Sequence, residues 1–337
     1  MPVSSRVAGI GVHLPEHTRT TAETESRLRA GNPQLSLATG LIRRMTGVES
    51  VHVRPDDWQV SDLAVAAARR ALEDAGLGPD DVDLLIFAGA SQDLIEPATS
   101  HIVAAKLGAT APVMDVKNAC NSVINAMEVG DALIRSGAYR RVLIASGEAP
   151  SIAVRWRIAD HDAFLRSFPG FSMSDGGAAV VLEADDSGEQ GILATRFLAV
   201  SRHWDVGTLP GGGSMRPHDA DADYFDMDGR ALQQAFLELG PEPVLELLAE
   251  NGWTWGDFDL VAIHQVALPY LPPIFERLGV PGDRTIVTVA DHGNLASVTL
   301  PLQLRLARDR GMVGPGSRVL LIGLAGGISL GLMAVRL

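Results

Sequence analysis

Similar apolar segments recur in the chain at a nearly constant interval, and this internal repeat restricts the fold more than any other feature. Asp83 opens one such segment, and Asp259 opens a similar one in the second half of the chain. The segments that begin at Arg141 and Arg318 are separated by almost the same interval. Similar segments in the same order at a fixed offset indicate a duplicated unit. The chain is therefore expected to fold as two related halves.

Each half contains an alternating series of predicted strands and helices. In the first half, a helix predicted over residues 61–75 ends before Gly76 and precedes the strand that opens at Asp83. In the second half, Thr285–Ala290 is predicted to be a strand ahead of a helix over residues 296–308. Such alternation is typical of α/β proteins whose mostly parallel sheets are covered by helices.

The predicted halves are residues 1–184 and residues 185–337. A duplicated α/β unit is expected to pair its copies about a pseudo-twofold axis. Equivalent strand and helix ends then meet between the halves, which is where open α/β sheets bind their ligands.

Composition excludes several classes of protein. The single cysteine among 337 residues rules out an intrachain disulfide and fits a reducing compartment. The first residues lack the pattern of a signal peptide, and no apolar run is long enough to span a membrane. A formal charge of −13 argues against nucleic acid and anionic membranes as partners. The protein is expected to be cytoplasmic.

The only cysteine, Cys120, lies where a predicted strand turns into a helix. Residues 111–116 are predicted to form the strand, and residues 122–135 have apolar side chains at helical spacing. Backbone N–H groups and the positive end of the helix dipole converge at such a point, so the thiol pKa is expected to be lowered and the nucleophilic thiolate favoured. The structural alternative is a small buried cysteine that only packs.

Three further elements are predicted to point to the same place. His264 ends the strand that opens at Asp259, and Asn294 follows Cys120 at nearly the repeat interval and is interpreted as its counterpart. A glycine-rich run, residues 323–331, follows the last repeated strand. Each has a structural alternative: a core histidine bonded to backbone, a turn or N-cap asparagine, and glycines needed for a tight turn.

These residue types are suited to acyl-thioester chemistry. A cysteine that carries an acyl group needs a thiolate, a base or hydrogen-bond donor near the leaving thiol, and N–H groups for the oxyanion. The N–H of Cys120 and a glycine N–H could form the oxyanion hole. Neutral His264 and the amide of Asn294 could both donate to a substrate oxygen that becomes an enolate.

Motifs along nearly the whole chain resemble the β-ketoacyl-acyl-carrier-protein synthase III group of the thiolase superfamily. The matching segments are Asn118–Cys120, Ser174–Ala179, Phe225–Arg230, His264–Gln265, Gly293–Asn294 with Ala296–Ser297, and Ala325–Gly327. Each is weak alone, but this order and spacing are specific.

The resemblance implies a catalytic triad of Cys120, His264 and Asn294, with an oxyanion hole formed by the N–H groups of Cys120 and Gly326. It also implies a thiolase fold, duplicated and five-layered in the order α-β-α-β-α, and a homodimer. The expected substrates are acyl-coenzyme A or acyl-carrier-protein thioesters, with no cofactor and no metal.

The chain departs from the family's pattern at the coenzyme A site. Leu41 and Met45 stand where the fatty-acid-initiating members have the tryptophan and arginine that clamp adenine. A donor bound to a carrier protein is therefore an open alternative, with Arg43 and Arg44 as candidate coenzyme A or carrier contacts; ordinary solvated charge is their structural alternative. After His264, Val266–Pro269 replaces the usual Ala-Asn.

The segment 91–100 resembles a loop of the relatives that join two fatty acyl thioesters head to head. In those relatives a glutamate before a proline reaches into the partner's active site as a base, and Glu96 lies at the matching place. A partly buried carboxylate could remove an α-proton. The alternative is a glutamate of a surface loop.

The leading hypothesis is a ketosynthase III-like acyltransferase of fatty-acid-like or polyketide metabolism that loads an acyl group on Cys120 and condenses it with a second acyl thioester. One alternative is transfer of the Cys120-bound acyl group to an oxygen or nitrogen nucleophile. Another is a non-catalytic subunit of a heterodimeric synthase, although such subunits tend to lose the cysteine or the histidine.

Overall fold

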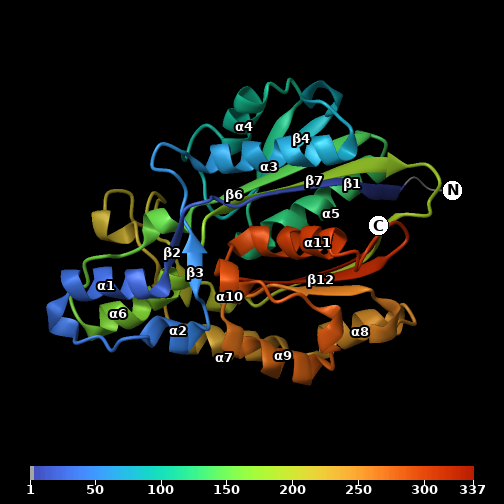
Figure 1. The fold of residues 1–337 in the computed structure, drawn as a ribbon. Helices are drawn as coiled ribbons and strands as arrows, with labels where there is room; N and C mark the ends of the chain where they lie inside the picture. The colour runs from blue at the N-terminus through green and yellow to red at the C-terminus, as the bar shows by residue number, and fades with distance from the viewer. Residues whose placement is uncertain (1–3) are drawn as a thin grey trace.

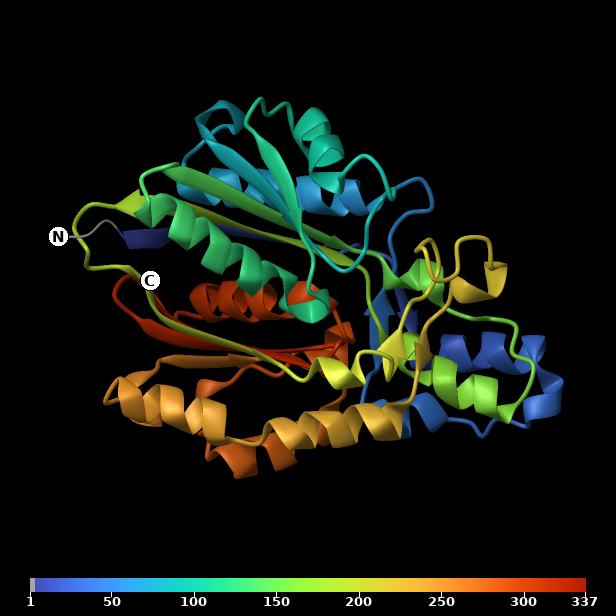
Figure 2. The ribbon, with the colours of Figure 1, turned by 180° about the vertical axis from the view of Figure 1, so that it is seen from behind.

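The computed structural model describes residues 4–337, and two stacked β-sheets form its centre (Figures 1 and 2). The first sheet has the strand order β1-β7-β6-β4-β5. Its strands are β1 (Ser4–His13), β4 (Leu84–Ala88), β5 (Val113–Val116), β6 (Arg141–Glu148) and β7 (Gly176–Asp185).

The second sheet has the order β11-β12-β13-β8 in the described part of the chain. Its strands are β8 (Gly191–Ala199), β11 (Leu260–Ile263), β12 (Arg318–Ala325) and β13 (Ser329–Arg336). The strand registers repeat the offsets seen in the sequence. Leu84 pairs with Val142 in the first sheet, and Leu260 pairs with Val319 in the second. The duplication therefore extends to the pairing of individual residues.

Both sheets are mixed, so the prediction of mostly parallel sheets is wrong. The parallel pairs are β4 with β5 and β6, and β11 with β12. Strands β7 and β13 run antiparallel to both of their neighbours. The tight turn between β12 and β13 explains the direction of β13, because a short connection joins antiparallel strands.

The segment Thr285–Ala290 is not a strand, which corrects a second prediction. The side chain of Gln265 takes the place of a neighbouring strand there. Its amide donates to the carbonyl of Ile286 at 2.7 Å, and its Oε1 accepts from Thr288 N–H at 2.8 Å and Val289 N–H at 3.1 Å. With its backbone groups satisfied in this way, the chain turns into the short helix α10 (Val289–His292).

Helices cover and separate the two sheets, giving five layers in the predicted order α-β-α-β-α (Figures 1 and 2). Two helices lie between the sheets: α5 (Ser122–Arg135) and α11 (Thr299–Asp309). The outer face of the first sheet is covered by α3 (Val60–Ala75) and α4 (Thr99–Leu107). The outer face of the second is covered by α7 (Gly229–Leu239), α8 (Glu242–Glu250) and α9 (Leu271–Leu278).

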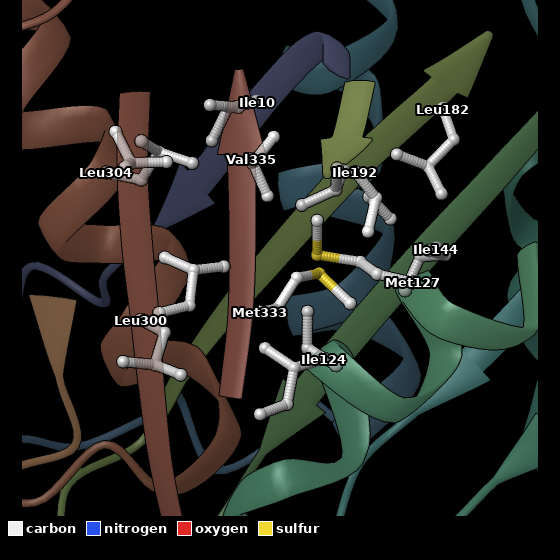
Figure 3. Packing of buried hydrophobic residues seen from close by; sticks show 14 of the residues in the cluster. Ile10, Ile124, Met127, Ile144, Leu182, Ile192, Leu300, Leu304, Met333 and Val335 are labelled. Carbon is white, nitrogen blue, oxygen red and sulfur yellow. The ribbon is translucent and has the colours of Figure 1, made fainter. Parts of the chain in front are cut away.

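The largest apolar cluster fills the space between the sheets (Figure 3). Ile124 and Met127 of α5 meet Met333 and Val335 of β13, and Leu300 of α11 lies to the left of β13 in this view. The burial of these apolar side chains is the main contribution to the free energy that holds the two halves together. The ends of α5 and α11 are thereby fixed relative to both sheets.

Smaller elements lie at one end of the molecule, beside the sheets (Figures 1 and 2). They are β2 (Thr18–Thr20), α1 (Thr21–Gly31), α2 (Leu41–Thr46), β3 (Ser50–His52), α6 (His161–Ser167), β9 (Gly207–Thr208) and β10 (Asp226–Met227). None of the helices in residues 4–337 has the length and apolar character needed to cross a bilayer.

Candidate active site

Cys120 lies in a 3₁₀ turn, η3 (Ala119–Asn121), between β5 and α5, as predicted from the sequence. Ala119 adopts a φ of 45°, a conformation that L-residues rarely take. Ser122, the first residue of α5, closes the turn, because its Oγ donates to the carbonyl of Ala119 at 2.7 Å and accepts from Asn118 N–H at 2.9 Å. The cysteine is thus held on a sharp, defined bend.

This turn from the first half packs on the sheet of the second half. The amide of Asn121 donates to the backbone carbonyl of Ser329 at 3.2 Å and to its Oγ at 3.0 Å. Gly323 of β12 faces the same turn, and a Cβ added there would lie 2.7 Å from Cδ1 of Ile124 and would also overlap Asn121. The cysteine turn therefore needs a residue without a side chain opposite it.

His264 follows β11 directly and lies beside this contact. Its N–H donates to the carbonyl of Ile322, the residue before Gly323, at 2.8 Å. The residue is 3% exposed, and neither ring nitrogen has a hydrogen-bond partner within residues 4–337. The alternative of a core histidine bonded to backbone is therefore wrong. Buried polar atoms without partners are rare, and a functional site is one of their explanations.

Burial lowers the pKa of His264 to about 4. The imidazole is therefore neutral near pH 7, with one nitrogen that donates and one that accepts. This is the protonation state expected from the sequence.

Asn294 is fixed by its own backbone and by that of its neighbours. Its N–H donates to the carbonyl of Ser172, and its carbonyl accepts from Ser174 N–H, both at 2.9 Å. The side-chain Oδ1 accepts from Ala296 N–H at 3.0 Å, so the residue does have the turn role that was its structural alternative. This bond also orients the amide, whose NH₂ group makes no hydrogen bond within residues 4–337 and remains available as a donor.

The structural counterpart of Cys120 is Ser297, not Asn294. Ser297 follows Cys120 at the same interval that separates Arg318 from Arg141, and it lies in the 3₁₀ turn η11 (Ala296–Val298) that precedes α11. Ala296 has a φ of 48°, as Ala119 has a similar value in the equivalent turn. Asn294 lies before this turn, so its interpretation as the counterpart of the cysteine is wrong. The two turns are in contact with each other.

The expected lowering of the thiol pKa is also wrong. Burial and the negative charge of Glu148 together raise the pKa of Cys120 to about 12, although its own backbone N–H acts in the opposite direction. The residue is only partly exposed to solvent. The N-terminal end of the helix does not offset the rise in the pKa of Cys120 that burial causes. The resting form of Cys120 near neutral pH is therefore the thiol.

Gly326 lies in the turn between β12 and β13, in the glycine-rich run. The next two residues of this turn, Gly327 and Ile328, have φ values of 76° and 54°. A Cβ added at Gly326 would have only the carbonyl oxygen of Gly207 near it, at 4.0 Å. Gly327 therefore has the tight-turn role of the structural alternative, whereas Gly326 faces open space.

Comparison with known proteins identifies the family. The profile described as 3-oxoacyl-[acyl-carrier-protein] synthase III matches residues 114–200, and the profile of its C-terminal part matches residues 248–337. The thiolase N-terminal domain profile matches residues 43–155. A β-ketoacyl-[acyl-carrier-protein] synthase III of Cereibacter sphaeroides is 33% identical over 341 residues, covering 100% of both chains. One of Rhodospirillum rubrum is 35% identical over 339 residues, covering 99% of each.

The chain belongs to the β-ketoacyl-acyl-carrier-protein synthase III family. It is accordingly an acyltransferase of the condensing-enzyme type. Solved structures show the same thiolase fold. A structure of Xanthomonas campestris OleA is similar at a TM-score of 0.90 and 23% identity, covering 100% of this chain and 99% of that one. A synthase III from Xanthomonas oryzae pv. oryzae is similar at 0.87 and 23%, covering 99% of each.

Glu96 makes no hydrogen bond to Cys120, His264 or Asn294 within residues 4–337. It is exposed, in the loop between β4 and α4, next to the apolar side chains of Leu94 and Ile95, which are 52% and 68% exposed. Within one chain, residues 4–337 offer it no hydrogen bond. An active-site role for Glu96 would therefore require the site of a second subunit, as the resemblance implied.

Arg43 and Arg44 lie on the short helix α2 and are both exposed. Arg43 pairs with Glu49 at 2.6 Å, and Arg44 donates to the carbonyl of Thr39 at 2.6 Å. These contacts fit the structural alternative of surface charge, and leave the guanidinium groups accessible to a phosphate.

Glu148, the last residue of β6, was not singled out from the sequence. It is 1% exposed, and Oε1 accepts from Oγ of Ser297 at 2.5 Å. A glutamate at the C-terminal end of a long apolar strand was the available signal, because a carboxylate is rarely buried without a specific reason.

Proposed function

We propose that this synthase loads an acyl group onto Cys120 from an acyl thioester and then condenses it with a second acyl thioester, forming a carbon–carbon bond. The observation that carries the proposal is His264. It is buried and neutral, neither of its ring nitrogens has a partner within residues 4–337, and its backbone is hydrogen-bonded to the strand on which the Cys120 turn packs.

In the loading step, the Cys120 sulfur attacks the thioester carbonyl of the first substrate. The thiol proton passes to the departing thiolate, with the accepting nitrogen of His264 as its carrier. The N–H groups of Cys120 and Gly326 would stabilise the tetrahedral oxyanion. Because the resting group is a thiol, loading requires this proton transfer at the moment of attack.

In the condensing step, the second substrate becomes an enolate through loss of carbon dioxide or of an α-proton. The donating nitrogen of His264 and the NH₂ of Asn294 would hold the enolate oxygen. The enolate carbon then attacks the acyl group on Cys120, and the sulfur leaves and takes up a proton. Two neutral donors suit an oxygen that gains charge without being protonated.

The donor is proposed to be a coenzyme A or acyl-carrier-protein thioester, with Arg43 and Arg44 as contacts for phosphate or for the acidic carrier. The curated relatives named above are carrier-protein synthases, which supports this substrate class. We place the reaction in fatty-acid-like or polyketide metabolism.

A homodimer is also part of the proposal. Strand β5 is the edge of the first sheet, with no strand on its outer side in residues 4–337, and its Met114 is 37% exposed. An open strand edge can pair with the same edge of a second subunit. Such a dimer would allow Glu96 to reach the partner's site as a base.

The decisive experiment separates loading from condensation in the Asn294→Ala variant. Intact-protein mass spectrometry after incubation with acyl-coenzyme A should show the adduct on Cys120 at near wild-type rate. Formation of the β-ketoacyl product from a malonyl thioester should fall by about 10²-fold or more, as for loss of one oxyanion donor. Condensation at the wild-type rate would contradict the proposed role of Asn294. Transfer to an oxygen or nitrogen nucleophile that survives the substitution, without condensation, would favour the alternative acyltransferase.

A further inference from the structure

Glu148 joins three parts of the structure through one buried carboxylate. Oε1 accepts from Ala90 N–H at 2.9 Å and from Oγ of Ser297 at 2.5 Å, while Oε2 accepts from Ser91 N–H at 3.0 Å. Oγ of Ser297 is also 2.8 Å from Oγ of Ser146. The carboxylate therefore ties the end of β6 to the first residues of the loop that carries Glu96 and to the turn before α11.

These hydrogen bonds fit an ionised carboxylate. Ser146 can donate to Ser297, Ser297 can donate to Glu148, and both backbone N–H groups can only donate. A protonated Glu148 would instead donate to Oγ of Ser297, and the Ser297 hydroxyl would donate to Ser146. The pKa of Glu148 is raised by burial, and the hydrogen bonds to Ser297, Ala90 and Ser91 offset this effect only in part.

Within residues 4–337, no cationic side chain pairs with the carboxyl group of Glu148. The charged side chains on the elements around it are engaged elsewhere. Asp62 of α3 pairs with Lys106, Asp93 accepts from Ser61 N–H, and Lys117 donates to Gln92. His264 is neutral near pH 7 and Glu96 is exposed. Burial raises the pKa of Cys120, and the negative charge of ionised Glu148 raises it further.

We propose that Glu148 is a positioning residue of the condensing reaction, which holds the Asn294 turn through Ser297 and places a negative charge next to the turn that contacts that of Cys120. The inference rests on the proposed function. The positioning role acts through two hydrogen bonds. Glu148 accepts from Ser297, and the N–H of the adjacent Ala296 donates to the amide oxygen of Asn294. A donor that is moved by about 1 Å can lose about 10²-fold in rate.

The electrostatic part acts on the sulfur. A carboxylate near a thiol disfavours the thiolate, which is the direction found for Cys120. It favours the uncharged forms of the sulfur, the thiol and the thioester. Glu148 thereby protects the resting nucleophile from ionisation while it keeps the enolate donor in place.

The Glu148→Gln variant tests the charge. Glutamine retains an oxygen for Ala90 and Ser297 but removes the negative charge. The pH profile of Cys120 alkylation by iodoacetamide, between about pH 7 and 10, should shift to lower pH, with alkylation several-fold faster at a given pH. Glu128→Gln is the matched control, because Glu128 lies on the helix that follows Cys120 and bonds to Thr195 instead. Its profile should match that of the wild type.

The Ser297→Ala variant tests the positioning. It removes the link to the Asn294 turn but keeps the charge, so alkylation should be unchanged, loading should stay within a few-fold, and condensation should fall by about 10-fold or more. An unshifted alkylation profile in Glu148→Gln, or an unchanged ratio of condensation to loading in Ser297→Ala, overturns the proposal. If Glu148→Gln does not fold, Ser297→Ala decides alone. Alkylation needs no substrate, so failure of the wild type to accept any acyl group would contradict the proposed function and leave the charge test intact.

Discussion

The two 3₁₀ turns that precede α5 and α11 occupy equivalent places in the duplicated fold but have different surroundings. Both begin with an alanine of positive φ, Ala119 and Ala296, and each packs on the end of a strand from the other half. The backbone has therefore kept its shape in both copies. What differs is the side chain on each turn and the residues that face it.

The Cys120 turn is open where the Ser297 turn is closed. Gly323 of β12 packs against Asn121, the residue after Cys120, whereas Ser146, at the equivalent position of β6, bonds to Ser297. Ala88 lies at the end of β4, where the second half has His264 at the end of β11. Within residues 4–337, one copy presents a thiol, a glycine and an imidazole whose nitrogens have no partner, whereas the serine of the other turn is engaged in hydrogen bonds. The proposed chemistry belongs to the first copy, and the second would serve as its support.

The largest effect is expected when the thiol is moved from the Cys120 turn to the Ser297 turn. Cys120→Ala should lose acyl loading by about 10³-fold or more, as expected for removal of a nucleophile. Adding Ser297→Cys should not restore it, because that position is 1% exposed and bonded to Glu148 and Ser146. Mass spectrometry of both variants after incubation with acyl-coenzyme A makes the comparison. An adduct at position 297 would show that the two turns are chemically interchangeable.

The second prediction concerns how the free energy of unfolding depends on pH. It uses the His264→Ala variant, which gives position 264 the residue found at its counterpart, Ala88. The pKa of His264 is about 4 in the folded protein, against an ordinary value of 6.5. The unfolded chain therefore binds more protons between these values, so the free energy of unfolding should fall as the pH falls from 6.5 towards 4. The contribution of His264 is about 3 kcal/mol across this range.

Chemical denaturation at several pH values should show a flatter slope in His264→Ala than in the wild type. The variant also leaves a cavity, so its stability at neutral pH is not the relevant quantity, and the slopes are compared instead. Parallel pH dependences would mean that the imidazole is not desolvated as the structure indicates.

The smallest effect is expected on the free energy of unfolding when the residues that pack against the two turns, Gly323 and Ser146, are substituted. Gly323→Ala should destabilise the protein by about 1–3 kcal/mol, because the added methyl overlaps Asn121 and Ile124. Ser146→Ala, at the equivalent place, should cost about 1 kcal/mol through its lost hydrogen bond to Ser297. Urea denaturation measures both. If Ser146→Ala were the more damaging change, the open side of the site would be misassigned.

Much of the fold follows from patterns that the sequence displays directly. The nearly equal intervals from Asp83 to Asp259 and from Arg141 to Arg318 reappear in the strand registers, because duplicated strands keep their pairing. The strand-to-helix junction at Cys120 was also predictable, since both flanking segments have clear periodicity. The direction of β7 and β13 was not, because apolar periodicity does not by itself distinguish parallel from antiparallel strands.

Other features depend on tertiary contacts that no local pattern contains. Thr285–Ala290 has the residue types of a strand, but a single side chain, Gln265, satisfies its backbone. The pKa of Cys120 depends on burial and on Glu148, a residue distant in sequence. The true counterpart of Cys120 was obscured because the catalytic candidate Asn294 lies shortly before Ser297, at nearly the expected offset.

The imidazole of His264 has a consequence for which molecules the enzyme tolerates. Neither desolvated ring nitrogen has a hydrogen-bond partner within residues 4–337, which disfavours the empty site by about 1–3 kcal/mol for each unmet group. The carbonyl oxygen of a ligand accepts from the protonated nitrogen and relieves that part of the penalty, whereas a thioether of the same shape does not. The proposed site should therefore discriminate against analogues that lack the oxygen far more sharply than against those that differ by a methylene.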